Sequence, residues 1–308
     1  MMSSICRSCG GPLSSLTVRE SSDPTPRRVD WAGQAALTGG LFLLVLALLR
    51  ANDDGWSTTA IVAELIGAAV LLAAFVQIER RAVDPMLPLG FFRNPAFTGA
   101  QVAAFAISAS FFAIFLYTTL YLQEILRLSP IETGLVYLPG TALIFLVSGA
   151  SAALTSKVPP SVLIVTGLML VAAGMGLMLV LEPNSDWTAL MPGLLMGCLG
   201  TGLFNPAVVA VALGSVDEHH SGLASGTNDA FRQGGIALGV AVFGAIIPAG
   251  AAFGHGSAAD YVTGMHHAAI VGAVVAALGA VACSRLFRVG LASSGRRLAE
   301  AAVAVASR

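Results

Sequence analysis

The stretch "LASGTNDAFRQGGIALGVAVFG", residues 223–244, joins a polar beginning to an apolar run and places two charged residues in its first half. A helix needs about 20 mostly apolar residues to cross a bilayer, because hydrocarbon offers its backbone no hydrogen-bond partners. Asp229 and Arg232 raise the free energy of such a helix, and a charge inside a membrane segment usually has a use. The stretch therefore predicts a membrane helix with a polar function.

The composition supports the same class of protein. Hydrophobic residues make up 56% of the 308 residues and charged residues only 11%, a balance outside the range of soluble domains. The net charge is -1, and the basic residues do not gather into a patch interleaved with aromatics. These properties predict a membrane protein and argue against nucleic-acid binding.

Eight stretches are long and apolar enough to span a membrane, and breaker residues separate them. The sequence therefore predicts an all-α, polytopic membrane protein. The expected spans are residues 31–49, 59–78, 97–121, 131–154, 160–181, 187–212, 224–248 and 265–286.

Arginine and lysine are distributed unevenly between the two sides of these spans. Thirteen of the 16 lie on the side that holds both chain ends, whereas only Arg50 and Arg127 lie on the other side. Cytoplasmic loops carry the excess of positive charge, so both termini are expected in the cytoplasm.

The first 29 residues have no apolar signal-peptide core, and we expect an unstructured leader there. Cys6 and Cys9 alternatively suggest a zinc knuckle, for which no second ligand pair exists.

The third expected span carries a stripe of polar and aromatic residues along one helical face. Such a stripe suits the wall of a cavity for an amphipathic compound, and it equally suits packing in which polar side chains bond to neighbouring helices. The stripe consists of Gln101, Phe105, Ser108, Phe112, Thr119 and Gln123.

Proline and glycine mark helix kinks and close helix contacts. Proline removes a backbone hydrogen bond, and glycines four residues apart let two helix backbones approach each other. We expect kinks in the fourth and sixth spans and close packing in the seventh. The residues are Pro139, Gly140, Asn205, Pro206, Gly235 and Gly239.

Asp229 and Arg232 lie three residues apart and share one helical face. They either neutralise each other near the headgroups, with the arginine reaching toward water, or join Asn228 and Gln233 in a polar gate or pathway inside the bundle.

A membrane enzyme is not expected, because the histidines do not gather at one depth: His219 and His220 fall on the cytoplasmic side, and the other three on the outer side. We expect neither a metal nor a cofactor.

Three segments together resemble a known family: "ERRAVDPMLPLGFFRNPAF", "YLQEILRLSPIETGLVYLPG" and "LFNPAVVAVALGSVDEHHSGLASGTNDAFRQGGIALGVAVFG". Their order and spacing are similar to the C-terminal part of the fourteen-spanning drug:proton antiporters of the major facilitator superfamily. "RRVDWAGQ" and "DDGWS" resemble the extra helix pair that links the two halves of that family. The resemblance thus divides the chain into a leader (1–29), a linker helix pair (30–79), a loop (80–96), a six-helix bundle (97–288) and a cytoplasmic tail (289–308).

The resemblance implies alternating access and the export of small amphipathic or cationic compounds in exchange for protons, in the inner membrane of the cell. Arg232 and Gln233 match a signature of the family, as do Gly235 and Gly239, whereas Asp229 departs from it. The loop between the fourth and fifth spans keeps only Lys157 of the family's basic residues. An N-terminal six-helix half would be the missing partner. A non-transporting fragment that binds another transporter chain is the alternative.

Overall fold

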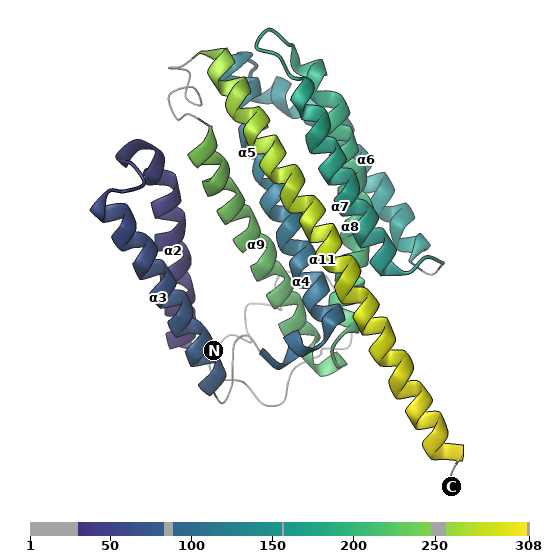
Figure 1. Ribbon diagram of the computed structural model, residues 1–308. Helices are drawn as coiled ribbons and strands as arrows, with labels where there is room; N and C mark the ends of the chain where they lie inside the picture. Colours follow the sequence, from purple (N-terminus) through teal and green to yellow (C-terminus); the bar gives the residue numbers. More distant parts are fainter. Residues whose placement is uncertain (1–29, 83–88, 156, 248–256, 307–308) are drawn as a thin grey trace, which may run out of the picture.

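The computed structural model describes residues 30–82, 89–155, 157–247 and 257–306, and every regular element in these ranges is helical. Long helices run side by side in two groups: a pair and a larger bundle (Figure 1). The pair is α2 (Trp31–Asp54) and α3 (Thr59–Arg81). The bundle contains α4 (Pro95–Ile107), α5 (Ala113–Leu120), α6 (Pro130–Leu154), α7 (Pro160–Leu177), α8 (Met191–Gly214), α9 (Ser221–Ile246) and α11 (Ala258–Ala306).

Short helical segments complete the bundle. Two π-helical turns, η2 (Ser108–Phe112) and η3 (Tyr121–Ile125), continue α4 and α5 into a single span, Pro95–Ile125. The 3-10 turns are η1 (Leu89–Arg93), η4 (Met178–Val180), η5 (Trp187–Leu190) and η6 (Glu218–His220). The expected third span is therefore present, but the sequence pattern did not predict its π-helical turns.

Seven helical segments in the described part of the chain are long and apolar enough to cross a membrane, so this is a multi-pass membrane protein. They correspond to the first six expected spans and the last one. The remaining expected span is present as α9. Its 26 residues are long enough to cross a membrane, but its first half is too polar for it to count among the seven apolar segments. The last helix differs most from expectation, because α11 continues unbroken to Ala306 and is about 74 Å long.

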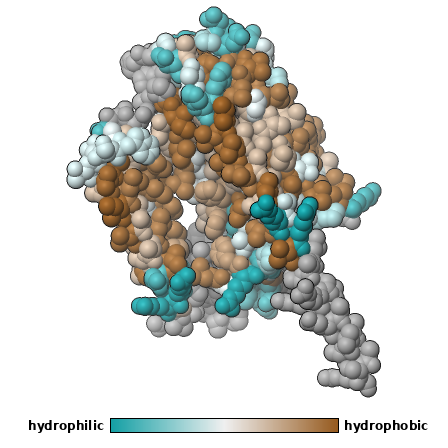
Figure 2. All heavy atoms as spheres, viewed as in Figure 1, coloured by the Kyte–Doolittle hydropathy of each residue, from teal (hydrophilic) through white to brown (hydrophobic). Residues whose placement is uncertain are grey.

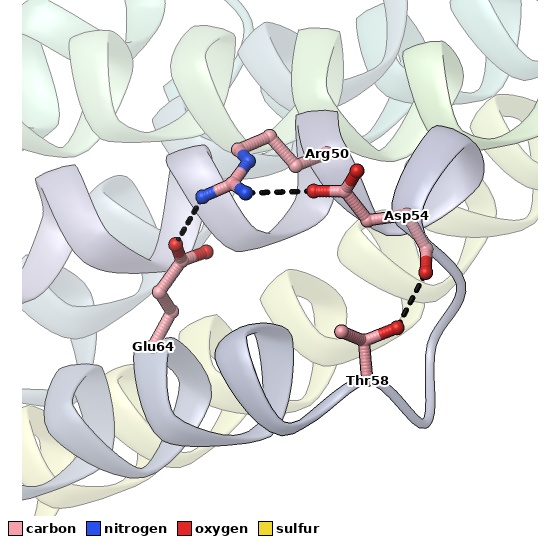
Figure 3. Close-up of polar contacts among 4 residues, drawn as sticks. All are labelled: Arg50, Asp54, Thr58 and Glu64. Atoms are coloured by element: carbon pink, nitrogen blue, oxygen red, sulfur yellow. Dashed lines mark hydrogen bonds and ion pairs between the residues drawn. The ribbon is translucent and has the colours of Figure 1, made fainter.

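Helices α2 and α3 form a helical hairpin. Charged side chains connect the two helices near the turn between them (Figure 3). Arg50 near the end of α2 contacts Asp54 at 2.7 Å and Glu64 of α3 at 2.6 Å. The Glu64 side chain is only 15% exposed and is paired with Arg50. The hairpin contacts the bundle through α2, which packs against α9.

Glycines allow a close contact between the backbones of α7 and α8. A Cβ atom on Gly174 would lie 2.7 Å from the carbonyl oxygen of Gly193, and one on Gly167 would lie equally close to the carbonyl oxygen of Gly200. Contacts this short leave room for hydrogen only, so glycine is required at these positions.

The face of the molecule drawn in Figure 2 is apolar over the middle of the helices, with hydrophilic residues toward both ends. Exposed side chains on α11 recur at helical spacing, which is the pattern of a lipid-facing stripe. They are Ile270, Val274, Leu278 and Val281. The opposite side of α11 is buried against α4 and α7.

Candidate functional site: a polar face shared by α4 and α9

Helices α4 and α9 cross closely at the two glycines predicted for close packing. A Cβ atom on Gly235 would lie 2.7 Å from the carbonyl oxygen of Phe105 and 2.9 Å from the Ser108 side chain. One on Gly239 would lie 2.6 Å from the Ala113 side chain. The close contact expected of these glycines is therefore present, and it fixes the register of α9 against α4.

A buried polar pair lies within this crossing. The Asn228 amide donates a hydrogen bond to the Gln101 side-chain oxygen at 3.2 Å, and both side chains are buried. The Gln101 amide nitrogen and the Ser108 hydroxyl are also buried, but neither has a hydrogen-bond partner among the described residues. Buried polar groups without partners are rare in native proteins, and they often mark sites of function or bound water. Gln101 and Ser108 thus lie inside the helix contact, whereas the other four stripe residues are half-buried.

Arg232 extends from α9 toward the middle of the third span. Its guanidinium carbon lies 5.7 Å from the centre of the Phe112 ring, within the range of a cation–π contact. Phe112 is part of η2, near the midpoint of the span Pro95–Ile125. The arginine and the phenyl ring are both half-buried, so one edge of the contact stays open.

The register of the helices shows which way this arginine points. Gly235 contacts Phe105 and Ser108, so it lies at their height along the third span. Arg232 precedes Gly235 by three residues, and its backbone therefore lies close to the height of Phe105. Phe112 lies about two turns farther from the end at which both helices start. The guanidinium therefore reaches toward the centre of the span. This direction argues against the alternative in which Arg232 reaches back toward water at the headgroups.

An ion pair between Asp229 and Arg232, one of the two alternatives that the sequence left open, is absent from this structure. No oxygen of Asp229 lies within 4.0 Å of an Arg232 nitrogen, since both residues are described and no ion pair joins them. Asp229 and Gln233 are exposed on α9, in contrast to the buried Asn228. The four predicted pathway residues therefore divide into an inward-facing Asn228, a half-buried Arg232 and two exposed side chains.

Aromatic rings continue from Phe112 toward the far end of the span, because Phe112 and Phe115 both contact the buried ring of Phe111, with ring centres 6.3 and 5.9 Å from its centre. Phe115 stacks on Tyr137 of α6 with ring centres 4.4 Å apart. Hydroxyl groups hold this tyrosine in place, because its oxygen lies 2.8 Å from that of Thr118 and 3.0 Å from that of Thr119. We call Phe112, Phe115 and Tyr137 the aromatic wall, and all three are half-buried. Thr119 was predicted as a stripe residue, whereas Tyr137 was not.

The other predicted residues are outside this face. Pro139 is exposed on α6, and Gly140 packs against Cys198 of α8, where an added Cβ would lie 2.8 Å from the sulfur. Asn205 and Pro206 are half-buried within α8. Both helices are continuous through their prolines, and the kinks stay a prediction. Gln123 is half-buried in η3, and Cys6 and Cys9 lie outside the described residues.

A second aromatic cluster, missed by the sequence interpretation, closes the end at which α4 and α9 start. Phe91 makes edge-to-face contacts with Phe97 and with His220, each at 5.5 Å. Phe92 of η1 lies 5.8 Å from Phe231 of α9. Asn94 donates a hydrogen bond to the Ser215 carbonyl at 3.0 Å. The repeated phenylalanines in "GFFRNPAF" were the available signal, but two of their partners, His220 and Phe231, are more than 100 residues away.

Sequence comparison identifies the family. The family model described as Major Facilitator Superfamily matches residues 1–240. The chain belongs to the major facilitator superfamily. Its similarity to the "Puromycin resistance protein pur8" of Streptomyces alboniger is 34% identity over 223 residues, which is 71% of this chain and 44% of that protein.

Other similar members of this superfamily carry comparable names. The "Multidrug resistance protein Stp" of Mycobacterium tuberculosis is 32% identical over 75% of this chain and 43% of its own length. The "Tetracenomycin C resistance and export protein" of Streptomyces glaucescens is 30% identical over 73% of this chain and 42% of its own length. The chain thus spans less than half the length of these relatives. The comparisons support a small-molecule transporter family rather than an enzyme family.

Proposed function

We propose that this chain forms one wall of a membrane exporter for small amphipathic or cationic compounds. Export proceeds by alternating access in exchange for protons. The observation that carries the proposal is the polar face of α4 and α9, where Arg232 reaches Phe112 near the middle of the span. An arginine at that depth raises the free energy of an isolated helix by roughly 2.5–3.5 kcal/mol on insertion scales, so its presence favours a role in a pathway. The names of the relatives support the same function.

We further propose that the chain is the C-terminal part of a fourteen-spanning antiporter. The α2–α3 hairpin is then the linker pair, and an N-terminal six-helix half supplies the second wall. The polar residues exposed on α9 support this arrangement, because Asp229 and Gln233 would otherwise face lipid. The arginine distribution favours an inner-membrane protein with both termini in the cytoplasm.

A chimera tests this function. The chain replaces the aligned portion of the puromycin resistance protein in a bacterial strain without its own efflux pumps, and accumulation of puromycin and ethidium is measured. We expect lower accumulation in cells with the chimera, and a protonophore should restore it. The relative without its aligned portion and this chain alone are the controls, and neither should export.

The alternative function, a fragment that does not transport, has a different outcome. A chimera that inserts at normal abundance but lowers the accumulation of neither compound would favour that alternative and contradict the export proposal. Insertion is checked by immunoblotting of membranes with an antibody against the tail "GRRLAEAAVAVASR".

A further inference from the structure

The charge balance around Arg232 carries information about the compound that would bind there. The guanidinium is half-buried and close to the aromatic wall. No carboxylate of the described residues lies within 4.0 Å of it, whereas Arg50 of α2 has two such partners. A charge taken out of water is normally paired. Arg232 is therefore a cation whose partner is not among the side chains around it.

The charged side chain nearest to Arg232 in sequence does not pair with it, and three of the helical segments packed against α9 carry no charge. Asp229 lies about one turn closer to the start of α9, exposed and beyond ion-pair distance. The described residues of α4, η2 and α5, which face α9, include no acidic or basic side chain. None of these three elements therefore places an opposite charge against the guanidinium.

The aromatic wall supplies a second element of recognition. Phe112 lies beside the guanidinium, and Phe115 continues the wall to Tyr137. Guanidinium groups bind carboxylates through two parallel hydrogen bonds, and aromatic rings stack on flat organic molecules. A planar aromatic compound with one acidic group would place its charge at Arg232 and its rings along the wall.

We infer that Arg232 and the aromatic wall form a subsite selective for planar aromatic acids. This inference rests on the proposed export function. Among the amphipathic compounds of that proposal, it favours anions at this position, with neutral compounds binding more weakly. Asp229 is the group that would weaken this preference for anions, because a cationic compound could bind to its carboxylate instead.

Binding of three matched probes tests the inference. The probes are 9-anthracenecarboxylate, its uncharged amide and 9-(aminomethyl)anthracene, which share one ring system and differ in charge. The full chain is placed in phosphatidylcholine nanodiscs, a lipid of no net charge, and binding is followed by fluorescence anisotropy against empty nanodiscs. We expect the acid to bind about tenfold more tightly than the amide, as one charge-assisted hydrogen bond provides, and more tightly than the amine.

Substitutions separate the charge from the wall. Arg232→Gln should remove the preference for the acid, and Arg232→Lys should keep part of it, because lysine retains the charge but not the planar pair of donors. Phe115→Leu should weaken all three probes by a similar factor. The matched control is Arg127→Gln, which removes an arginine that is 70% exposed and follows η3, outside the subsite, and it should change nothing.

Several results would overturn the inference: no binding of any probe, equal binding of acid and amide, an acid preference that survives in Arg232→Gln, or tighter binding of the amine that Asp229→Asn abolishes. Its failure is distinguishable from failure of the export proposal. A chimera that exports puromycin while the chain shows no acid preference removes only this inference. An acid preference that depends on Arg232, combined with a chimera that does not export, removes only the export proposal.

Discussion

At the scale of single residues, two arginines occupy the membrane segments in opposite ways. Arg50 has carboxylates on two sides, at 2.7 and 2.6 Å, and lies at the turn of a hairpin. Arg232 has an aromatic ring at 5.7 Å and no carboxylate within ion-pair distance among the described residues. The first arrangement stabilises the contact between two helices. The second leaves a charge available to a ligand or to a missing part of the protein.

Arg232→Ala is expected to reduce export by the chimera at least about tenfold, because removing a charge from a pathway eliminates charge-assisted contacts worth more than 1.4 kcal/mol. Initial rates of puromycin efflux measure the effect, and immunoblotting of the membrane fraction checks that the protein is equally abundant. Asp229→Asn should have a milder effect. Normal export by Arg232→Ala would show that the arginine only supports packing.

The Arg50–Glu64 pair gives a prediction about stability. Arg50→Leu should lower the midpoint of thermal unfolding by about 2–4 °C, because Glu64 is then a nearly buried carboxylate without its partner. Since the Arg50 side chain is 44% exposed, solvent screening keeps the effect modest. The double variant Arg50→Leu, Glu64→Leu should recover part of the loss. Additive losses in the double variant would show that the two side chains are not coupled.

At the scale of helices, hydropathy predicted most of the fold because the bilayer imposes length and apolarity on every span. Seven expected spans have helices that satisfy this criterion. Hydropathy does not encode which carbonyl each backbone amide contacts, so it did not predict the π-helical turns Ser108–Phe112 and Tyr121–Ile125. Nor did it predict the full length of α11, because the apolar signal ends well before Ala306.

The site was predictable only in part, for a similar reason. Periodicity placed Gln101 on one face of its helix and Asn228 near the start of another, but their hydrogen bond depends on the register of two helices 127 residues apart in sequence. Glycine spacing indicated close packing at Gly235 without indicating the partner, which is α4. The direction in which the Arg232 side chain points could not be predicted either, because it depends on the same register of α9 against α4.

The crossing of α4 and α9 offers a matched pair of glycines. Gly235→Ala should lower the midpoint of thermal unfolding by several degrees, because the added methyl group would lie 2.7 Å from the Phe105 carbonyl oxygen and force the helices apart. Gly234→Ala is the control: nothing lies within 4 Å of its Cβ position, and alanine favours helix more than glycine does. Unfolding curves of the purified variants measure both. Equal midpoints would mean that the crossing is looser than this geometry requires.

At the scale of the whole molecule, the two sides of the bundle have different characters. The exposed stripe on α11 is apolar, as expected for a lipid-facing surface, whereas α9 exposes Asp229 and Gln233. A bilayer tolerates the first surface and disfavours the second. The contrast supports a molecule in which α9 faces a water-filled pathway and α11 faces lipid.

Cysteine accessibility in the chimera tests that arrangement most directly. Gln233→Cys and Leu278→Cys are introduced separately after the four native cysteines have been replaced by serine, and labelling by a membrane-impermeant maleimide is timed. The account predicts that Gln233→Cys reacts at least about tenfold faster than the lipid-facing Leu278→Cys and that a transported compound slows its reaction. Equal protection of both positions would mean that the polar face of α9 is closed to water, and the proposed export pathway would be wrong.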